Sequence, residues 1–226
     1  MLGVSDARHF RRLVAGFCLI AAPAVLLIGA LIHPQSQDDT AAHLAVVGES
    51  PGRYYLAHAI ILAGLVLFLP AILGLMHLLR QRATAFGHLG GGLVIIGLFG
   101  AAAVVGVDGI ATSEMGRAGV NAEEMAALLE RIRESAGLRI FGGVGAFGFL
   151  LGGLLLAYGL WRAGAVQPWI AGGIVVANIV LFIGQVRDNR AIIAVAGAIA
   201  LIAFGAIGWR LLTESDEQWA REASRG

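Results

Sequence analysis

Six apolar stretches, each long enough to cross a lipid bilayer, dominate this sequence of 226 residues. The hydrocarbon core of a bilayer is roughly 30 Å thick, and an α-helix needs about 20 apolar residues to cross it. The stretches are Leu13–Ile32, Tyr55–Leu79, Phe86–Ile110, Leu138–Trp161, Pro168–Val186 and Ala191–Leu212. In hydrocarbon, backbone polar groups must be bonded within the protein, which favours helices. The sequence therefore predicts an all-α, polytopic integral membrane protein that forms a six-transmembrane-helix bundle.

Charged residues are too few in this sequence to cover the surface of a soluble globule. They make up 14% of the chain, whereas a soluble domain contains roughly 25%. The net charge of +1 gives no support to a nucleic-acid partner, and the predicted partner of the apolar surface is the lipid bilayer. We interpret residues 1–212 as a single membrane domain and residues 213–226 as a short polar cytoplasmic tail.

Arginine residues next to the spans predict how the chain crosses the membrane. The short connections 80–85 and 162–167 contain arginine and no acidic residue, whereas acidic residues collect at the opposite end. Short cytoplasmic loops are enriched in basic residues, so both termini are predicted to be cytoplasmic. Tyr54 and Tyr55 would then lie at the outer interface, where aromatic side chains are common. The sixteen basic residues are all arginine, which is typical of GC-rich bacterial coding and favours a bacterial cytoplasmic (inner) membrane.

The two long extracytoplasmic connections contain signals for short helices. A short helix over 41–47 is predicted after Asp39, and Ser50 followed by proline predicts that the second long helix begins before the membrane. Asn121, with an acidic residue three positions later, is typical of a capping box. The helix that follows carries one apolar stripe at Met125, Leu128, Leu129 and Ile132.

Glycine-rich motifs predict close packing between the spans. Gly87–Gly91 and Gly148–Gly152 are both GxxxG motifs, which allow two helix backbones to approach closely in a membrane. Such motifs are frequent in glycine-rich helices, so we interpret them as packing within the bundle. A membrane-protein partner and a homo-oligomer both remain open.

The polar residues at membrane depth are the candidates for function, because burying a charge in hydrocarbon is costly. His58 and Asp108 lie on the second and third spans, which form a hairpin about a turn near residue 83. Each residue lies 25 positions from that turn, so the two are predicted at the same depth near the outer end. A hydrogen bond or ion pair between them is allowed if the two helices are rotated so that they face each other.

A second pair of histidines is predicted near the inner end of the same hairpin. His77 and His88 are also level with each other, and they are the only intramembrane pair that could hold a haem on facing helices. If His58 faces Asp108, however, His77 is turned about 100° around its helix and His88 about 200°. The helical rotation therefore favours the outer pair, and a haem bound by His58 or by His77 and His88 is the weaker hypothesis.

A metal site is a further hypothesis for the outer end. His33, His58 and Asp108 could bind zinc or copper(II), together with His43 or Glu114, because imidazole and carboxylate groups suit these ions. No HxxxH, HExxH or CxxC motif supports this assignment. The alternative is that the histidines are ordinary hydrogen-bonding side chains.

Transport is the third possibility. His58, Asp108, Asn178 and Gln185 could line an outward-facing cavity for a ligand or an ion, with Asp108 carrying a proton. In the alternative interpretation, Asn178 makes a hydrogen bond between helices and Asp108 pairs at a helix end.

Motifs for common enzymatic chemistry are absent from the sequence. It contains no G-x-S-x-G motif and no P-loop, and its glycine runs lie within predicted helices instead of following strands. The leading hypothesis is therefore a non-enzymatic accessory or assembly component, or a binder of a small or lipidic ligand, with its site near the outer leaflet. A small ion- or proton-coupled transporter and a metal- or haem-binding redox protein are the alternatives.

Overall fold

The computed structural model of the chain describes residues 7–117, 119, 121–217 and 219. These residues form eight helices and no strand, which confirms the all-α prediction. The helices are α1 (Ala7–Ile32), α2 (Thr40–Glu49), α3 (Pro51–Leu79), α4 (Thr84–Met115), α5 (Ala122–Glu134), α6 (Ala136–Arg162), α7 (Pro168–Val186) and α8 (Arg190–Thr213). Of these, α1, α3, α4, α6, α7 and α8 are long and apolar enough to cross a membrane. The described chain is a six-helix membrane bundle with two short helices.

Each long helix contains the apolar stretch that predicted it; α4, α6 and α8 extend past that stretch at both ends, and α1 and α3 only at their N-terminal ends. The largest extensions are in α1, which begins at Ala7, and in α4, which continues to Met115. Only α7 has the predicted bounds. An apolar stretch ends at the first polar residues, whereas a helix continues until its backbone is capped or broken. This explains why the helices are longer than the stretches.

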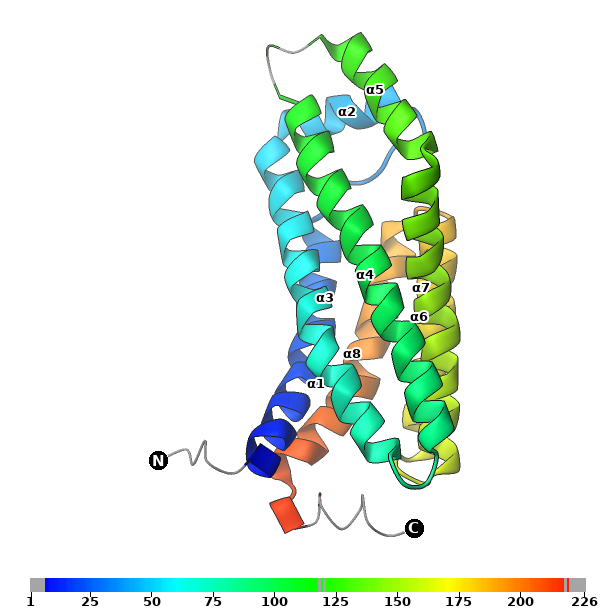
Figure 1. Cartoon of the computed structure of the whole chain (residues 1–226). Coiled ribbons are helices and arrows are strands. Elements are labelled where there is room, and N and C mark those ends of the chain that lie inside the picture. Colours follow the sequence, from blue (N-terminus) through cyan, green and yellow to red (C-terminus); the bar gives the residue numbers. More distant parts are fainter. Residues whose placement is uncertain (1–6, 118, 120, 218, 220–226) are drawn as a thin grey trace.

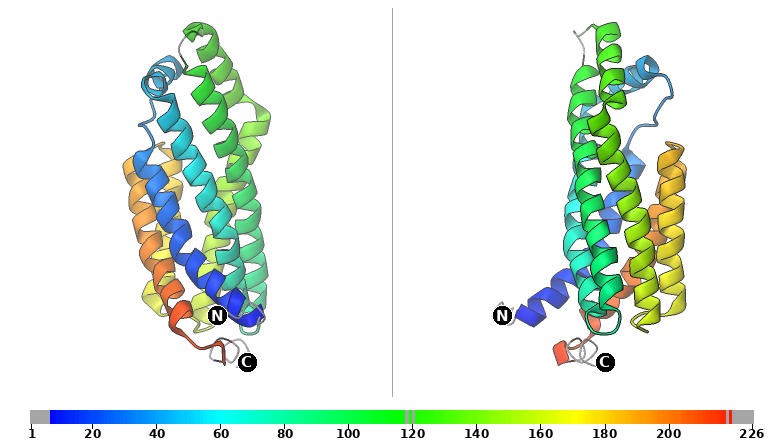
Figure 2. Two further views of the ribbon diagram at one scale, coloured as in Figure 1. Left: turned by 90° about the vertical axis from the view of Figure 1, so that its left-hand side faces the viewer. Right: turned by 45° about the vertical axis from the view of Figure 1, so that its right-hand side comes forward.

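The six long helices form a closed ring. Each contacts the next in the order α1, α3, α4, α6, α7 and α8, and α8 returns to contact α1. Figure 1 shows that α1 begins and α8 ends at the same end of the bundle, whereas α2 and α5 lie at the opposite end. Figure 2 shows the same separation from two other sides. We call the end with α2 and α5 the outer end.

The outside of the ring is apolar. Large hydrophobic side chains such as Phe99 and Val186 are 68% and 70% exposed, and similar residues project outward from every long helix. A soluble protein would hide such a surface from water, so this exterior is suited to lipid.

Glycine residues bring neighbouring helices into backbone contact. A Cβ added to Gly148 on α6 would lie 2.7 Å from the Cα of Gly97 on α4 and 2.8 Å from the carbonyl oxygen of Leu93. Gly91 on α4 instead faces the side chain of Met76 on α3. Through Gly91 and Gly148, both GxxxG motifs contact neighbouring helices of the same bundle, as predicted.

The two short helices pack over the outer ends of α3, α4 and α6. The side chains of Asp39 and Asn121 accept hydrogen bonds from the first turns of α2 and α5, as the sequence predicts. The apolar stripe of α5 faces inward, and its Leu129 is buried. The helix α3 begins at Pro51 as expected, although the side chain of Ser50 makes no capping bond.

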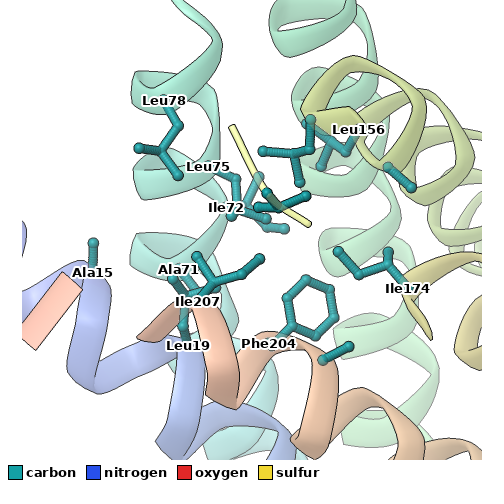
Figure 3. Packing of buried hydrophobic residues seen from close by; sticks show 14 of the residues in the cluster. Ala15, Leu19, Ala71, Ile72, Leu75, Leu78, Leu156, Ile174, Phe204 and Ile207 are labelled. Carbon is teal, nitrogen blue, oxygen red and sulfur yellow. The ribbon is translucent and has the colours of Figure 1, made fainter. Parts of the chain in front are cut away.

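Aliphatic and aromatic side chains pack against one another in the inner half of the ring. Figure 3 shows this packing, to which α1, α3, α6, α7 and α8 contribute. Below it, Arg12 of α1 donates to Asp216 at 2.7 Å, and Trp219 stacks on His77 with ring centroids 4.6 Å apart. Part of the predicted polar tail is therefore packed against the bundle. Residues 218 and 220–226 of that tail lie outside the described part of the chain.

Candidate functional site

His58 of α3 and Asp108 of α4 form a direct contact at the outer end of the ring. Nε2 of His58 lies 3.0 Å from Oδ2 of Asp108, and Nδ1 donates to the carbonyl oxygen of Tyr54 at 3.0 Å. The contact between Nε2 and Oδ2 is a hydrogen bond only if one proton lies between the two atoms. Because Nδ1 also carries a proton, the pair has no net charge whichever of these two atoms holds the proton between them.

Asp108 also accepts hydrogen bonds from two hydroxyl groups. The hydroxyl of Tyr54 donates to Oδ2 at 2.7 Å, and the hydroxyl of Thr112 donates to Oδ1 at 2.8 Å. Tyr54 precedes His58 by one helical turn, and Thr112 follows Asp108 by one turn, so each pair shares a helix face. Gly109 allows this approach, because a Cβ there would lie 2.5 Å from the Cβ of His58.

Tyr54 was predicted to lie at the outer interface with Tyr55, and this prediction is wrong for Tyr54. Tyr55 is exposed, but Tyr54 is fully buried because its hydroxyl reaches Asp108 across the helix pair. Its ring contacts His33 and His58, with centroids 4.8 Å and 4.4 Å away. Tyr54 therefore belongs to a polar cluster that also contains His33, His58, Asp108 and Thr112.

His33, which directly follows α1, joins this cluster from the opposite side. Its ring centroid lies 4.7 Å from that of His58. Nδ1 of His33 donates to the carbonyl oxygen of Pro34 at 2.7 Å, and Nε2 accepts from Arg190 at 3.0 Å. Burial, with the positive charge of Arg190 as the second cause, lowers the pKa of His33 to about 3. His33 is therefore neutral near pH 7.

Arg190 links the outer ends of α1 and α8. Besides His33, its Nη2 donates to the hydroxyl of Ser36 at 3.0 Å. Asp188, two residues earlier, faces the same space and provides an opposite charge nearby. The contact with His33 joins residues 157 positions apart in the sequence.

A cavity of about 360 Å³ extends from this cluster into the ring. Its outer end is lined by His33, His58, Asp108, Gln185, Asp188 and Arg190. Its deeper part is lined by aliphatic and aromatic side chains from all six long helices. The residues of this deeper part that Figure 3 labels are Ile72, Leu75, Leu156, Ile174 and Phe204. The cavity is therefore amphipathic, with one polar end and an apolar body.

Asn178 is the single polar side chain among the described residues that line the apolar body. Its Nδ2 donates to the carbonyl oxygen of Ile174 at 2.9 Å. The side chain packs flat against α6 at Gly153, where an added Cβ would overlap it. Asn178 thus combines a packing role between α6 and α7 with an amide group at the cavity wall.

No protein-family model, curated protein or solved structure matches this chain. The cavity and the polar cluster at its end are therefore the basis for any function assigned to it.

Two residues suggested as further metal ligands lie away from the His58–Asp108 pair. His43 is buried beside Tyr54 but does not line the cavity, and Glu114 is exposed and pairs with Arg117 at 3.0 Å. Both ring nitrogens of His33 already have partners. In the described ranges, no three histidine, cysteine, aspartate or glutamate side chains are grouped as metal ligands. The geometry gives the zinc or copper hypothesis no support.

The two inner histidines, His77 and His88, lie in different environments. His77 stacks on Trp219, whereas His88 is exposed and donates to the carbonyl oxygen of Thr84 at 2.9 Å. Neither residue lines the cavity. This arrangement gives no support to a haem between them.

The site also contains three residues that were not predicted from the sequence, namely Thr112, Arg190 and Ser36. The spacing of Asp108 and Thr112 by one helical turn was a usable signal, since residues four apart lie on one helix face. Arg190 and Ser36 had no such signal, because their contacts depend on the closure of the ring between α1 and α8.

Proposed function

We propose that this protein is a non-enzymatic membrane protein that binds a small amphipathic molecule in the cavity between its six long helices. The observation that supports this is the cavity lining, which is polar at the outer end and apolar below it. Its volume of about 360 Å³ lies within the range of small-molecule sites, which is roughly 300–1,000 Å³.

The size of the cavity limits the molecule to one chain. A cavity of about 150 Å³ holds one benzene ring, and the cavity here has a little over twice that volume. A single alkyl chain, or one ring with a short chain, would therefore fill it. The polar head of such a molecule would lie at His58 and Asp108.

The apolar body of the cavity does not favour a small ion- or proton-coupled carrier. The cavity reaches Asp108, but below this residue Asn178 is the single polar group among the described lining residues. An ion would lose its hydration there without gaining ligands, at a large cost in free energy.

We further propose that the protein lies in a bacterial cytoplasmic membrane, with both termini in the cytoplasm and the polar end of the cavity toward the outer leaflet. The arginine residues of the short connections 80–85 and 162–167 support this orientation. The all-arginine basic composition supports the bacterial origin.

Cysteine labelling in intact bacterial cells tests the orientation. Glu123 on α5 and Gln81 in the turn between α3 and α4 are both exposed, at opposite ends of the bundle. In a Cys18→Ala background, we expect a membrane-impermeant maleimide to label Glu123→Cys in intact cells and Gln81→Cys only after the membrane is disrupted. The reverse pattern would show that the termini are extracytoplasmic.

Filling the cavity tests the binding function. The protein is placed in nanodiscs, and saturable binding of tritium-labelled decan-1-ol, decanoate and decylammonium is measured against empty nanodiscs. We expect Ala200→Phe, which fills the cavity from α8, to weaken the binding of the best ligand by at least about tenfold. Ile202→Phe places the same side chain on the lipid-facing side of α8 and should bind as the wild type does. If none of the three molecules saturates the wild type, the proposed function is wrong.

A further inference from the structure

The polar end of the cavity has no net charge. Among its lining residues, Arg190 is positive and Asp188 is negative, and the hydrogen-bonded His58–Asp108 pair is neutral as a unit. His33 accepts a hydrogen bond at Nε2 and donates at Nδ1, which is the pattern of a neutral imidazole. The charges of these groups cancel, so the site offers no excess charge to a charged ligand.

A charged head group would need a free counter-charge at this depth, because an unpaired buried ion is costly. A carboxylate would need the charge of Arg190, which Asp188 already offsets; Nη2 of Arg190 donates to His33 and Ser36, whereas its Nε is buried without a partner. An ammonium group would need Asp108, whose oxygens already accept bonds from two hydroxyl groups and take part in the contact with His58. Neither ion therefore finds a free counter-charge, although hydrogen-bonding positions remain on both residues.

An uncharged hydroxyl group fits the remaining hydrogen-bonding capacity. A carboxylate has about four acceptor positions, and three of those on Asp108 are occupied. Oδ1 accepts from Thr112 alone and retains one position. The side chain of Asp108 is 29% exposed, and the residue lines the cavity. A hydroxyl can donate to this oxygen, whereas a ketone or ester has no proton to give.

We infer that the molecule bound in the cavity is a single-chain lipid alcohol or phenol whose hydroxyl donates to Oδ1 of Asp108. This inference rests on the proposed function. Its apolar chain then lies along the aliphatic and aromatic wall. Both classes share the hydroxyl group. They differ in whether a ring or an alkyl chain occupies the part of the apolar body next to the polar end of the cavity.

The same nanodisc measurement tests this inference through the relative affinities of the wild-type protein at neutral pH. We expect decan-1-ol to bind at least about tenfold more tightly than decanoate and decylammonium, after correction for their partition into lipid. A further measurement with 4-octylphenol distinguishes the alcohol class from the phenol class. If the phenol binds more tightly than decan-1-ol, the ligand carries a ring. Asp108→Asn should reduce the preference for the alcohol.

The outcomes separate this inference from the proposed function. If a charged molecule saturates the wild type as tightly as the alcohol does, or more tightly, the cavity binds amphiphiles but the hydroxyl inference is wrong. If Asp108→Asn keeps the full preference for decan-1-ol while its binding still saturates, the hydroxyl does not interact with Asp108. The wild-type comparison does not depend on the folding of any variant.

Discussion

Replacing Asp108 by alanine will lower the free energy of unfolding of the bundle by about 3 kcal/mol. The carboxylate is the common acceptor of Tyr54, Thr112 and His58. Its removal leaves Tyr54 and Thr112, both buried, with hydroxyl groups that no longer have their acceptor. Unfolding followed by circular dichroism in detergent, with increasing denaturant, measures this loss.

Thr112→Val provides a matched comparison for Asp108→Ala. The substitution keeps the shape of a buried side chain and removes one hydrogen bond to Asp108, so a loss of about 1 kcal/mol is expected. Equal losses in the two variants would contradict the central role of Asp108 among these contacts.

The second large effect is expected at the contact between α4 and α6. Gly148→Ala will destabilise the bundle by about 1–3 kcal/mol, because its Cβ would overlap the backbone of Gly97 and Leu93. Backbone atoms cannot move aside as a side chain can, so the two helices must separate. The same unfolding measurement, together with the elution profile in detergent, checks this result.

Gly143→Ala on the same helix is the control for Gly148→Ala. A Cβ at Gly143 has no other atom within 4 Å, so the substitution meets no obstacle. It removes a flexible residue from a helix interior, which should leave the stability unchanged or raise it by up to about 1 kcal/mol. A loss at Gly143 as large as that at Gly148 would show that helix propensity, and not backbone contact, determines the effect.

The helices could be predicted from the sequence because a bilayer imposes a length on apolar segments. The depth of His58 and Asp108 was predictable for a similar reason, since both helices of the hairpin rise equally from the turn. Their rotation was not predictable in this way. It depends on Gly109, whose missing side chain lets α4 approach His58, and the hydropathy pattern does not distinguish this glycine from others in α4.

The cavity and half of the polar cluster could not be predicted from local patterns. His33 and Arg190 meet because the last long helix returns to the first, and the sequence distance between them contains no periodic signal. The cavity likewise has walls from all six long helices, so no pair of helices reveals it. Asn178 was correctly singled out as a polar group in a span, whereas its contact with Gly153 requires knowledge of the neighbouring helix.

The return of α8 to α1 has a consequence for biogenesis. The described helices are synthesised in sequence order, so the wall that α8 gives to the pocket is added only after the walls from the other five long helices.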